Sequence, residues 1–322
     1  MNEIPYQPSE MAELDLSSLA DEDIQDGHKS GYVAVAGRPN VGKSTLMNAL
    51  LHQKLAAVSH RPQTTRNRQL GILTTTEYQI IFVDTPGLVN PRHKLDEYMV
   101  ESARNSLQDA DIVLWLVDAS EPPGSSDRLI AGTLRDLSTD QKLILGVNKA
   151  DLLKPEDVLK RTGEYCSLVP ESEWLLFSAL KGNGLDALLQ LLIQLLPDGP
   201  RYFPADQTTD FFVRDIAAEL IREQIFLQMR EELPYGTAVV IEKFTEREDG
   251  LTQISSTIYV ERESHKKIII GAKGSQLRKI GMAARKEIEE LVGSKVFLEM
   301  WVKVEPNWRR NKEVLKHLGY SK

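Results

Sequence analysis

The chain has 322 residues, of which 41% are hydrophobic and 27% charged, a composition that excludes disordered and fibrous proteins. This length predicts two domains, because single cores rarely grow past about 250 residues. No apolar run approaches the roughly 18 residues of a membrane-spanning helix, and the acidic N-terminus does not resemble a secretory signal peptide. Cys166 is the single cysteine, so no internal disulfide can form and we expect a cytosolic protein.

The net charge of −8 is distributed unevenly along the chain. Residues 1–29 carry eight acids and one lysine without apolar periodicity, which predicts a disordered acidic tail. Residues 201–322 carry 21 Lys and Arg against 19 Asp and Glu, and residues 264–286 hold seven basic residues and no acid. A local basic face that binds nucleic acid is therefore compatible with an acidic chain.

From Gly31 onward, strand-like and helix-like segments alternate, as in a doubly wound α/β domain with a mostly parallel sheet. Near-continuous apolar runs are typical of parallel strands that helices cover on both faces. The predicted strands are residues 32–36, 78–83, 111–118, 142–147 and 174–177. We expect this domain to cover residues 30–196.

The cluster Pro197-Asp198-Gly199-Pro200 predicts a linker over residues 197–206. A second domain of mixed helices and strands is then expected over residues 207–322. Its predicted elements are a helix at 210–232, strands at 237–244 and 253–260 around a charged hairpin, a helix at 275–292 and a strand at 295–304.

A glycine-rich motif follows the first strand, and its sequence, GRPNVGKS, matches G-x-x-x-x-G-K-[ST] directly before a helix. Glycines let backbone amides curl around phosphates, and the helix N-terminus adds partial positive charge. Lys43 is expected to reach the β- and γ-phosphates, and the hydroxyl of Ser44 to bind Mg²⁺. The predicted phosphate-binding residues are Gly37, Asn40, Val41, Gly42, Lys43, Ser44 and Thr45.

Two further segments are expected to meet the γ-phosphate. Asp84 ends a strand and opens the motif DTPG, so its carboxylate can hold Mg²⁺ while the amide of Gly87 meets the phosphate. In the loop QTTR, a threonine hydroxyl would reach Mg²⁺ only when γ-phosphate is present. Both Thr64 and Thr65 are candidates, and Thr65 is favoured because related GTPases place this threonine directly before an arginine. The predicted catalytic residues are Lys43, Thr65, Asp84 and Gly87, and the predicted metal ligands are Ser44, Thr65 and Asp84.

The motif NKAD, which follows another strand, indicates guanine as the base. The carboxylate of Asp151 can accept hydrogen bonds from N1–H and the exocyclic amine of guanine, whereas adenine presents the wrong pattern. Asn148 is expected to tie this loop to the phosphate loop, and the stem of Lys149 to cover one face of the base. A backbone amide for the guanine carbonyl oxygen is expected from the segment Ser178, Ala179 and Leu180.

The motifs GRPNVGKS, DTPG, NKAD and SAL, in this order and each at the carboxyl end of a strand, resemble the motif set of the translation-factor class of GTPases. Many GTPases have a glutamine after the glycine of DTPG to orient the attacking water, but here Leu88 stands in that place. Because leucine cannot hydrogen-bond to water, we expect slow intrinsic hydrolysis and a switch rather than a high-turnover enzyme. In related families with P-N-V-G-K-S, the asparagine helps to bind a monovalent cation, often K⁺, which implies this role for Asn40.

The motif GAKG in the second domain, within the pattern I-I-I-G-x-x-G-x-x-L-x-x-I, resembles the KH-domain loop, which clamps about four nucleotides. A lone G-x-x-G is also typical of an ordinary turn, but the apolar spacing and the basic run favour a KH domain. Glycines let the backbone approach single-stranded RNA, and lysine adds charge at the tip. The candidate RNA-binding residues are Gly271, Ala272, Lys273, Gly274, Arg278 and Lys279.

From about Gly31 to Tyr320, with QTTR, DTPGL, NKAD, GAKG and a tryptophan-rich ending, the chain resembles the bacterial Era GTPases. The resemblance implies a GTPase domain followed by a KH domain of the bacterial type, with Mg²⁺ and GTP. It also implies binding to the 3′ end of 16S ribosomal RNA and assistance in 30S subunit maturation. A monomeric cytoplasmic protein, with peripheral association at the inner membrane, is the further implication.

Three other interpretations compete with this one. A tRNA-modification or tandem-domain ribosome GTPase shares PNVGKS and DTPG, but it needs a helical insertion or a second motif set that this chain lacks. A non-catalytic RNA-binding adaptor would not require an intact set of Lys43, Ser44, Asp84 and Asp151. An ATPase is opposed by Asp151.

Overall fold

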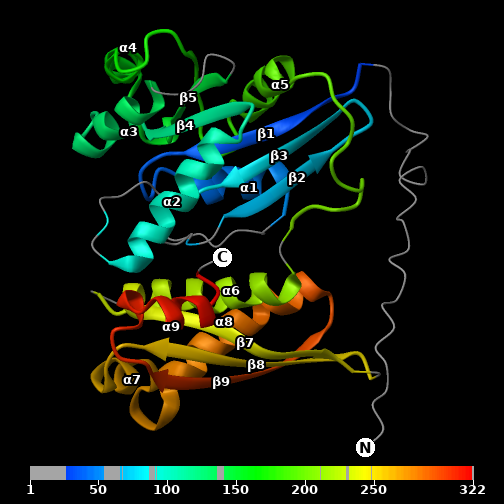
Figure 1. Ribbon diagram of the computed structural model, residues 1–322, viewed down its shortest axis with the longest axis vertical. Coiled ribbons are helices and arrows are strands. Elements are labelled where there is room, and N and C mark those ends of the chain that lie inside the picture. Colours follow the sequence, from blue (N-terminus) through cyan, green and yellow to red (C-terminus); the bar gives the residue numbers. More distant parts are fainter. Residues whose placement is uncertain are drawn as a thin grey trace, which may run out of the picture.

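The computed structural model describes most of the chain and consists of an N-terminal and a C-terminal domain, which Figure 1 shows one above the other. Of the predicted disordered tail of residues 1–29, residues 1–26 lie outside the described part and their disorder stays a prediction, whereas Lys29 already begins the first strand. The described residues are 27–53, 66, 68–86, 91, 93–135, 141–210, 212–229, 232–247 and 249–320.

Within the described residues, six strands of the N-terminal domain form one sheet in the order β2-β3-β1-β4-β5-β6. β2 runs antiparallel to β3, and all other neighbours are parallel. The prediction of a doubly wound, mostly parallel sheet is confirmed, and the antiparallel edge strand β2 is an addition to it. The strands are β1 (Lys29–Ala36), β2 (Gln69–Thr74), β3 (Tyr78–Asp84), β4 (Ile112–Asp118), β5 (Lys142–Asn148) and β6 (Glu173–Leu176).

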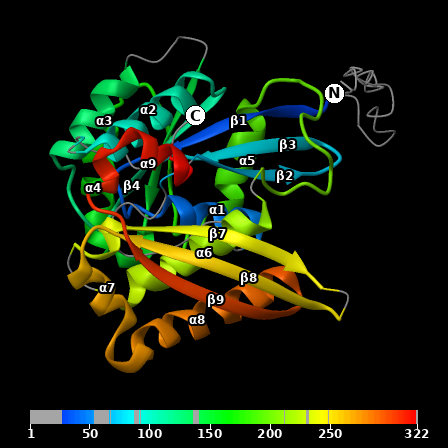
Figure 2. The ribbon, with the colours of Figure 1, turned by 60° about the horizontal axis from the view of Figure 1, so that its bottom comes forward.

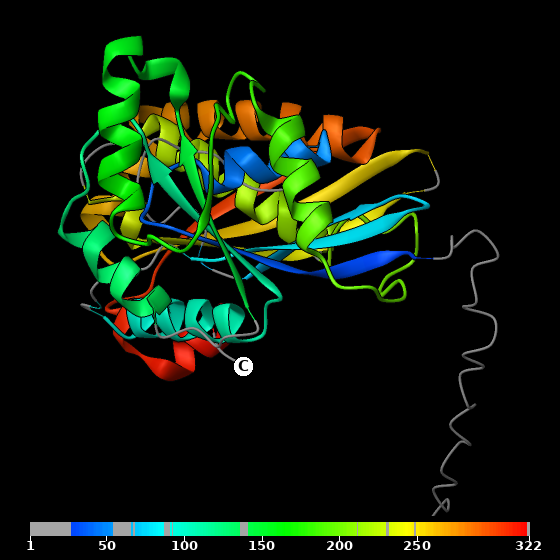
Figure 3. The ribbon, with the colours of Figure 1, turned by 90° about the horizontal axis from the view of Figure 1, so that it is seen from above.

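Helices cover both faces of this sheet, and Figure 3 shows α2 and α5 on opposite sides of the strands. Leu46 of α1 and Leu188 of α5 pack in the cluster on one face, and Ile130 of α3 and Tyr165 of α4 pack in the cluster on the other. Because both faces are covered, β4 is buried along its whole length, which explains its near-continuous apolar sequence. The helices are α1 (Lys43–Leu51), α2 (Lys94–Gln108), α3 (Ser125–Arg135), α4 (Val158–Cys166) and α5 (Leu185–Leu195).

The C-terminal domain packs helices against a sheet of order β7-β8-β9, in which β8 is antiparallel to β7 and parallel to β9. Its core joins Ile221 of α6, Ile254 of β8 and Ile280 of α8. The predicted helix at 275–292 and strand at 295–304 have the bounds found in the structure, while the predicted helix at 210–232 is shorter. The elements are α6 (Val213–Gln228), β7 (Thr237–Glu246), β8 (Leu251–Val260), α7 (Glu263–Ile270), α8 (Ser275–Val292), β9 (Lys295–Val304) and α9 (Lys312–His317).

The linker is held along the edge of the N-terminal sheet. The Nε2 of Gln79 in β3 donates to the carbonyl of Phe203 at 2.8 Å. The amide of Ile72 in β2 donates to the carbonyl of Thr208 at 2.8 Å, and the amide of Leu70 donates to the carboxylate of Asp210 at 2.9 Å. The linker therefore keeps contact with the N-terminal domain to residue 210, past the expected boundary at 206, and it covers an edge strand that would otherwise be exposed.

The two domains share an apolar cluster beside α2. Leu95 and Met99 of α2 pack with Tyr259 of β8, with Leu315 of α9 and with Trp308, which precedes α9. Figures 1 and 2 agree in placing the C-terminal segment next to α2. Since α2 directly follows the DTPG region in the sequence, a segment adjoining the expected nucleotide site contacts the second domain.

None of the described helices has both the length and the apolar character that crossing a membrane requires.

Candidate functional site

The loop of residues 37–42 runs from the end of β1 to the start of α1 in a conformation that requires glycine. Gly37 and Gly42 have φ of 150° and 105°. A Cβ at Gly37 would lie 2.4 Å from the carbonyl oxygen of Leu116, and one at Gly42 would lie 2.4 Å from Nδ2 of Asn148. Asn40 has φ of 68°, a left-handed conformation that asparagine adopts readily. The sequence thus selects a tight loop whose amides can approach a ligand closely.

Lys43, the first residue of α1, folds back over this loop. Its Nζ donates to the carbonyls of Gly37 at 3.1 Å and Arg38 at 3.2 Å. The side chain is 7% exposed, and burial lowers the pKa of this ammonium, while Asp84 opposes that shift. A buried cation at a helix N-terminus is suited to an anionic phosphate. Val41 in the same loop is fully buried, and Thr45 lies in the first turn of α1.

Ser44 and Asp84 provide the oxygens of the expected metal site. The Oγ of Ser44 donates to Oδ2 of Asp84 at 2.9 Å, and Asp84 is fully buried at the carboxyl end of β3. The hydroxyl of Thr85 donates to the carbonyl of Val35 at 2.8 Å and fixes the start of DTPG against β1. Mg²⁺ in such sites takes one or two protein oxygens together with phosphate oxygens and water, and this pair fits that mode. Over the described ranges, no three His, Cys, Asp or Glu side chains gather into a metal site of another kind.

The predicted switch residues Thr64, Thr65, Gly87 and Leu88 lie outside the described residues, and their roles stay predictions.

Asn148 connects three loops at this end of the sheet. Its Nδ2 donates to the carbonyl of Val41 at 2.8 Å, and its Oδ1 accepts from the amide of Ala179 at 2.9 Å. The asparagine is 2% exposed, so both hydrogen bonds are shielded from water. The phosphate loop, the NKAD loop and the loop of residues 178–180 are therefore held as one unit. The side chain of Leu180 points into solvent with 72% exposure.

Asp151 is exposed, and Ser178 orients its carboxylate. The Oγ of Ser178 donates to Oδ1 of Asp151 at 2.5 Å, and the amide of Lys181 donates to the same Oγ at 3.1 Å. The hydrogen bond from Ser178 leaves Oδ2 of the carboxylate open to the donors of a base. This orienting contact between the two loops could not be read from the motifs separately.

Asp118, the last residue of β4, is a site residue that the sequence analysis did not assign. Its Oδ2 accepts from Nζ of Lys149 at 2.6 Å, and its Oδ1 accepts from the amide of Ser120 at 3.0 Å. Burial disfavours the charged carboxylate, but the hydrogen bonds from Lys149 and Ser120 outweigh it and keep the pKa of Asp118 below its ordinary value. The signal in the sequence was an acid at the end of an otherwise apolar strand.

The substitution Asp118→Asn is expected to lower the free energy of unfolding at pH 7 by about 1–2 kcal/mol, because a charge-assisted hydrogen bond is lost. Since the pKa is lowered on folding, this contribution is present above the unfolded-state pKa of about 3.9 and disappears as the pH falls through the folded-state value. Urea denaturation at pH 7 measures it. In the control, Glu121→Gln removes a pair with Arg38 in which Glu121 is 59% exposed, and about 0.5 kcal/mol or less is expected. Equal losses in both variants would contradict the prediction.

The G-x-x-G loop joins α7 to α8, so it lies between two helices. Gly271 and Gly274 have φ of 71° and 78°, and Lys273 between them has φ of 50°. A Cβ at Gly271 would lie 2.7 Å from Cβ of Gln276, so only glycine fits there. The loop carries a basic surface, because these side chains are exposed: Lys273, Arg278, Lys279, Arg285 and Lys286.

A family model described as 50S ribosome-binding GTPase matches residues 32–149, and one described as KH domain matches residues 232–309. GTPase Era of Ruminiclostridium cellulolyticum is 47% identical over 294 residues, which are 91% of this chain and 98% of the relative. GTPase Era of Geotalea daltonii is 46% identical over 292 residues, which are 91% of this chain and 98% of the relative. This chain belongs to the Era family of GTPases. The expected family, the GTPase activity and the KH domain are thereby confirmed.

Solved Era structures extend the likeness to both domains. The crystal structure of Era in complex with MgGDPNP and nucleotides 1506–1542 of 16S ribosomal RNA has a TM-score of 0.88 and 41% identity, and it covers 92% of this chain and 100% of its own. The crystal structure of a single-residue variant of Aquifex aeolicus Era bound to GDP.AlF4⁻ has a TM-score of 0.87 and 41% identity, with 91% and 100% covered. The Era fold found in these structures is therefore the fold of the whole described chain.

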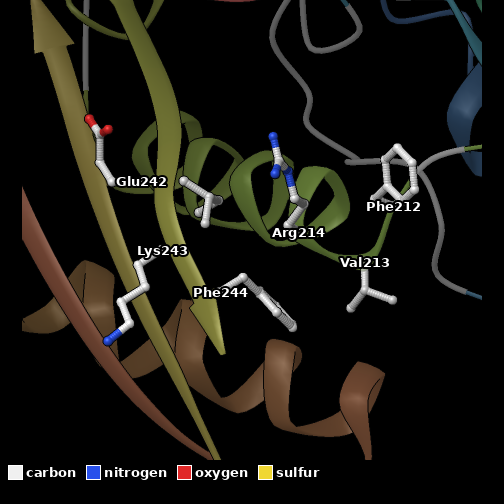
Figure 4. A pocket seen from close by; sticks show the side chains of 7 residues that line it. Phe212, Val213, Arg214, Glu242, Lys243 and Phe244 are labelled. Atoms are coloured by element: carbon white, nitrogen blue, oxygen red, sulfur yellow. The ribbon is translucent and has the colours of Figure 1, made fainter. Parts of the chain in front are cut away.

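A groove in the C-terminal domain of this Era chain contains none of the predicted site residues. Phe212, Val213 and Arg214 border it at the start of α6, and residues 241–244 of β7 form its other side (Figure 4). The pairing of β7 with β8 shifts register between Ile241 and Lys243 at this place. The groove is thus a local feature of the bulged strand, separate in composition from the nucleotide and RNA sites.

Proposed function

We propose that this chain is a GTP-dependent switch that binds the 3′ end of 16S ribosomal RNA and assists maturation of the 30S subunit. The observation that carries the proposal is the exposed, glycine-dependent loop between α7 and α8, in a chain that is 41% identical to an Era solved with nucleotides 1506–1542 of that RNA. In this function the N-terminal domain senses the nucleotide and the C-terminal domain holds the RNA.

In the phosphate site, the amides of the loop from Gly37 to Gly42 and the ammonium of Lys43 bind and orient the β- and γ-phosphates. Mg²⁺, when bound through Ser44 and Asp84, neutralises charge that develops on the phosphate oxygens. Lys43 is already directed over the loop by its bonds to Gly37 and Arg38, so little side-chain ordering is needed when phosphate arrives. This preorganisation favours a bound triphosphate.

In the base site, Asp151 accepts from N1–H and the exocyclic amine of guanine, with Ser178 holding the carboxylate. The Lys149 stem covers the base while its ammonium stays paired with Asp118. The amide of Ala179 donates to Asn148 in the structure, so a guanine carbonyl oxygen would share that donor or take it over. The proposed base site therefore includes the whole segment Ser178, Ala179 and Leu180, which supplies the backbone amide for the guanine carbonyl oxygen.

Thr65, in preference to Thr64, and the amide of Gly87 complete the site when γ-phosphate is bound. Leu88 offers no hydrogen bond to the attacking water, so intrinsic hydrolysis is slow and depends on another group or on a partner for acceleration. RNA held by the loop of residues 271–274, with Arg278 and Lys279, is the partner that fits the second domain.

Asn40 belongs to a monovalent-cation site in this proposal, because its left-handed backbone holds it at the turn of the phosphate loop. We expect GTP hydrolysis to be several-fold faster in KCl than in NaCl at equal ionic strength, and Asn40→Ala to abolish the difference. Initial rates of phosphate release measure both. A variant that keeps the full KCl effect would remove Asn40 from the cation site.

Crosslinking of the full chain to cellular RNA, followed by sequencing, tests the proposed partner. Reads concentrated at the 3′ end of 16S ribosomal RNA are expected, and reads spread evenly over unrelated RNA would refute the assignment. Hydrolysis assays with and without that RNA separate a switch from a non-catalytic adaptor, which would hydrolyse no GTP in either condition. In this proposal the protein acts in the cytoplasm as a monomer, and its contact with the inner membrane is peripheral.

A further inference from the structure

Arg66 crosses from the N-terminal domain into the C-terminal domain. It follows Thr65 in the sequence and precedes β2, so its position in the chain assigns it to the nucleotide-binding domain. Its guanidinium nevertheless donates to the carbonyl oxygen of Thr237 from Nη1 at 2.6 Å and to that of Tyr235 from Nη2 at 2.9 Å. The side chain is 1% exposed. A loop arginine next to the expected switch threonine is therefore buried in the other domain.

Two aromatic rings complete the socket that receives Arg66. Its Cζ lies 5.6 Å from the ring centroid of Trp308 and 5.8 Å from that of Tyr320, and these two rings stack at 5.9 Å with 23° between their planes. Cations are attracted to aromatic faces, more strongly when water is excluded. Trp308 is itself fixed, because its Nε1 donates to the carbonyl of Gly236 at 3.0 Å. The arginine thus holds the start of β7 and the C-terminal segment of the chain together.

The burial of this cation makes the contact sensitive to the loss of any one partner. Burial lowers the pKa of Arg66, Tyr320 opposes the shift and Arg222 adds to it. An arginine stays protonated in proteins, so the charge itself remains in the socket. Because an uncompensated buried charge is strongly unfavourable, loss of a partner in the socket is expected to favour the return of Arg66 to water.

The segment that follows DTPG also contacts the aromatic residues of the socket. Leu95 and Met99 of α2 belong to the apolar cluster that contains Trp308 and Tyr320. The chain segments after both γ-phosphate-sensing motifs are therefore attached to one cluster of the C-terminal domain. Two discrete arrangements of a shared element are the physical requirement for coupling between distant sites.

The cluster also lies within the domain that carries the RNA loop. On α6, Nε2 of Gln224 donates to Glu287 of α8 at 2.8 Å. Nearer the loop, Nε2 of Gln276 in the first turn of α8 donates to Gln228 at 3.2 Å. The guanidinium of Arg222, also on α6, is one of the charges that act on Arg66, and the ring of Phe226 on α6 lies edge-on against that of Tyr235, whose carbonyl accepts from Arg66. One helix thus adjoins both the socket and the helix that begins at the G-x-x-G loop.

We propose that Arg66 is a positioning residue that ties the switch threonine to the RNA-binding domain and is required for the nucleotide state to change RNA affinity. This inference rests on the proposed function, because it needs a chain that binds both GTP and RNA. With the socket filled, the chain is fixed one residue after Thr65. A change in the position of residue 66 between the GTP and GDP forms would then act directly on the socket. By linkage, RNA that favours the filled socket favours the GTP form by the same factor.

The test compares full-length wild type and Arg66→Ala, each with GDP or a non-hydrolysable GTP analogue, in binding a labelled oligonucleotide from the 3′ end of 16S ribosomal RNA. We expect the Kd values of wild type in the two states to differ at least about fivefold, and those of Arg66→Ala to differ less than about twofold. Affinity for GDP should stay unchanged, because the contacts of Arg66 described above involve no nucleotide-site residue. Arg66→Ala with the wild-type ratio would overturn the proposal.

Two further variants keep the test decisive. Arg68→Ala removes the same residue type two positions later. The guanidinium of Arg68 lowers the pKa of Tyr32 in the N-terminal domain, so this variant should keep the wild-type ratio of the two Kd values. Tyr320→Leu damages the socket from its other side and should lose the ratio, with no further loss in the double variant with Arg66→Ala. If Arg66→Ala does not fold, Tyr320→Leu decides. If wild type binds no RNA, both the proposed function and the role of Arg66 are refuted. If the RNA affinity of wild type and of Arg66→Ala changes equally between the two nucleotide states, only the role of Arg66 is refuted.

Discussion

Replacing Asp151 by asparagine is expected to weaken GTP binding by about 100-fold or more and to make xanthosine triphosphate the preferred nucleotide. The carboxylate can accept two hydrogen bonds from guanine, and each charge-assisted bond contributes about 1.5–3 kcal/mol. A loss of about 1.4 kcal/mol corresponds to a factor of about ten in affinity, so the two bonds account for the estimate. Xanthine has a carbonyl in place of the exocyclic amine, and the amide of asparagine can donate to it.

Titration with fluorescent nucleotides measures this change in specificity, and urea denaturation shows whether the variant is folded. Ser178→Ala is the matched control, because it removes the hydroxyl that donates to Oδ1 of Asp151 and leaves the carboxylate in place. We expect it to weaken GTP binding by about tenfold or less without favouring xanthine nucleotides. An Asp151→Asn protein that binds GTP as wild type does would remove Asp151 from the base site.

The buried parallel strands could be predicted from the sequence, whereas β2 could not. β4 is an unbroken apolar run because helices cover it on both sides, and this pattern needs no knowledge of distant partners. β2 contains Gly71, a residue that weakens strand signals. The ordering of β2 also depends on the linker, since Leu70 bonds to Asp210 and Ile72 to Thr208. Those partners lie far away in the sequence, so no local pattern indicates them.

The nucleotide site likewise contains parts that a local sequence pattern predicts and parts that depend on residues distant in the sequence. The phosphate loop could be predicted because its backbone amides are expected to bind phosphate, and the glycines of one short motif determine the path of that backbone. The pair of Asp118 and Lys149 could not, since it joins the ends of two strands through side chains. Arg66 is the extreme case, because its partner Thr237 stands 171 positions away and loop arginines are ordinarily solvated. The choice between Thr64 and Thr65 stays a prediction.

Placing acids in the RNA loop is expected to lower RNA affinity by at least about tenfold, because the loop would then repel the phosphates that it is proposed to clamp. The variant combines Ala272→Asp with Lys273→Asp. Both side chains are exposed, and Lys273 has φ of 50°, a left-handed conformation that aspartate tolerates. The fold and the hydrolysis of GTP without RNA should therefore remain unchanged. Fluorescence anisotropy with an oligonucleotide of the 16S 3′ end measures the affinity.

The control has to separate a clamp from general attraction to a basic surface. Arg285→Asn with Lys286→Asp changes the net charge by the same amount, on exposed positions further along α8. At a rise of about 1.5 Å per residue these positions lie about 15 Å beyond the start of the helix. A local clamp predicts a loss below about threefold in this control and an unchanged salt slope, since no phosphate contact is removed. Equal losses in both variants would mean that the RNA is held by the charge of α8 as a whole, and the glycines at 271 and 274 would then serve only the turn between two helices.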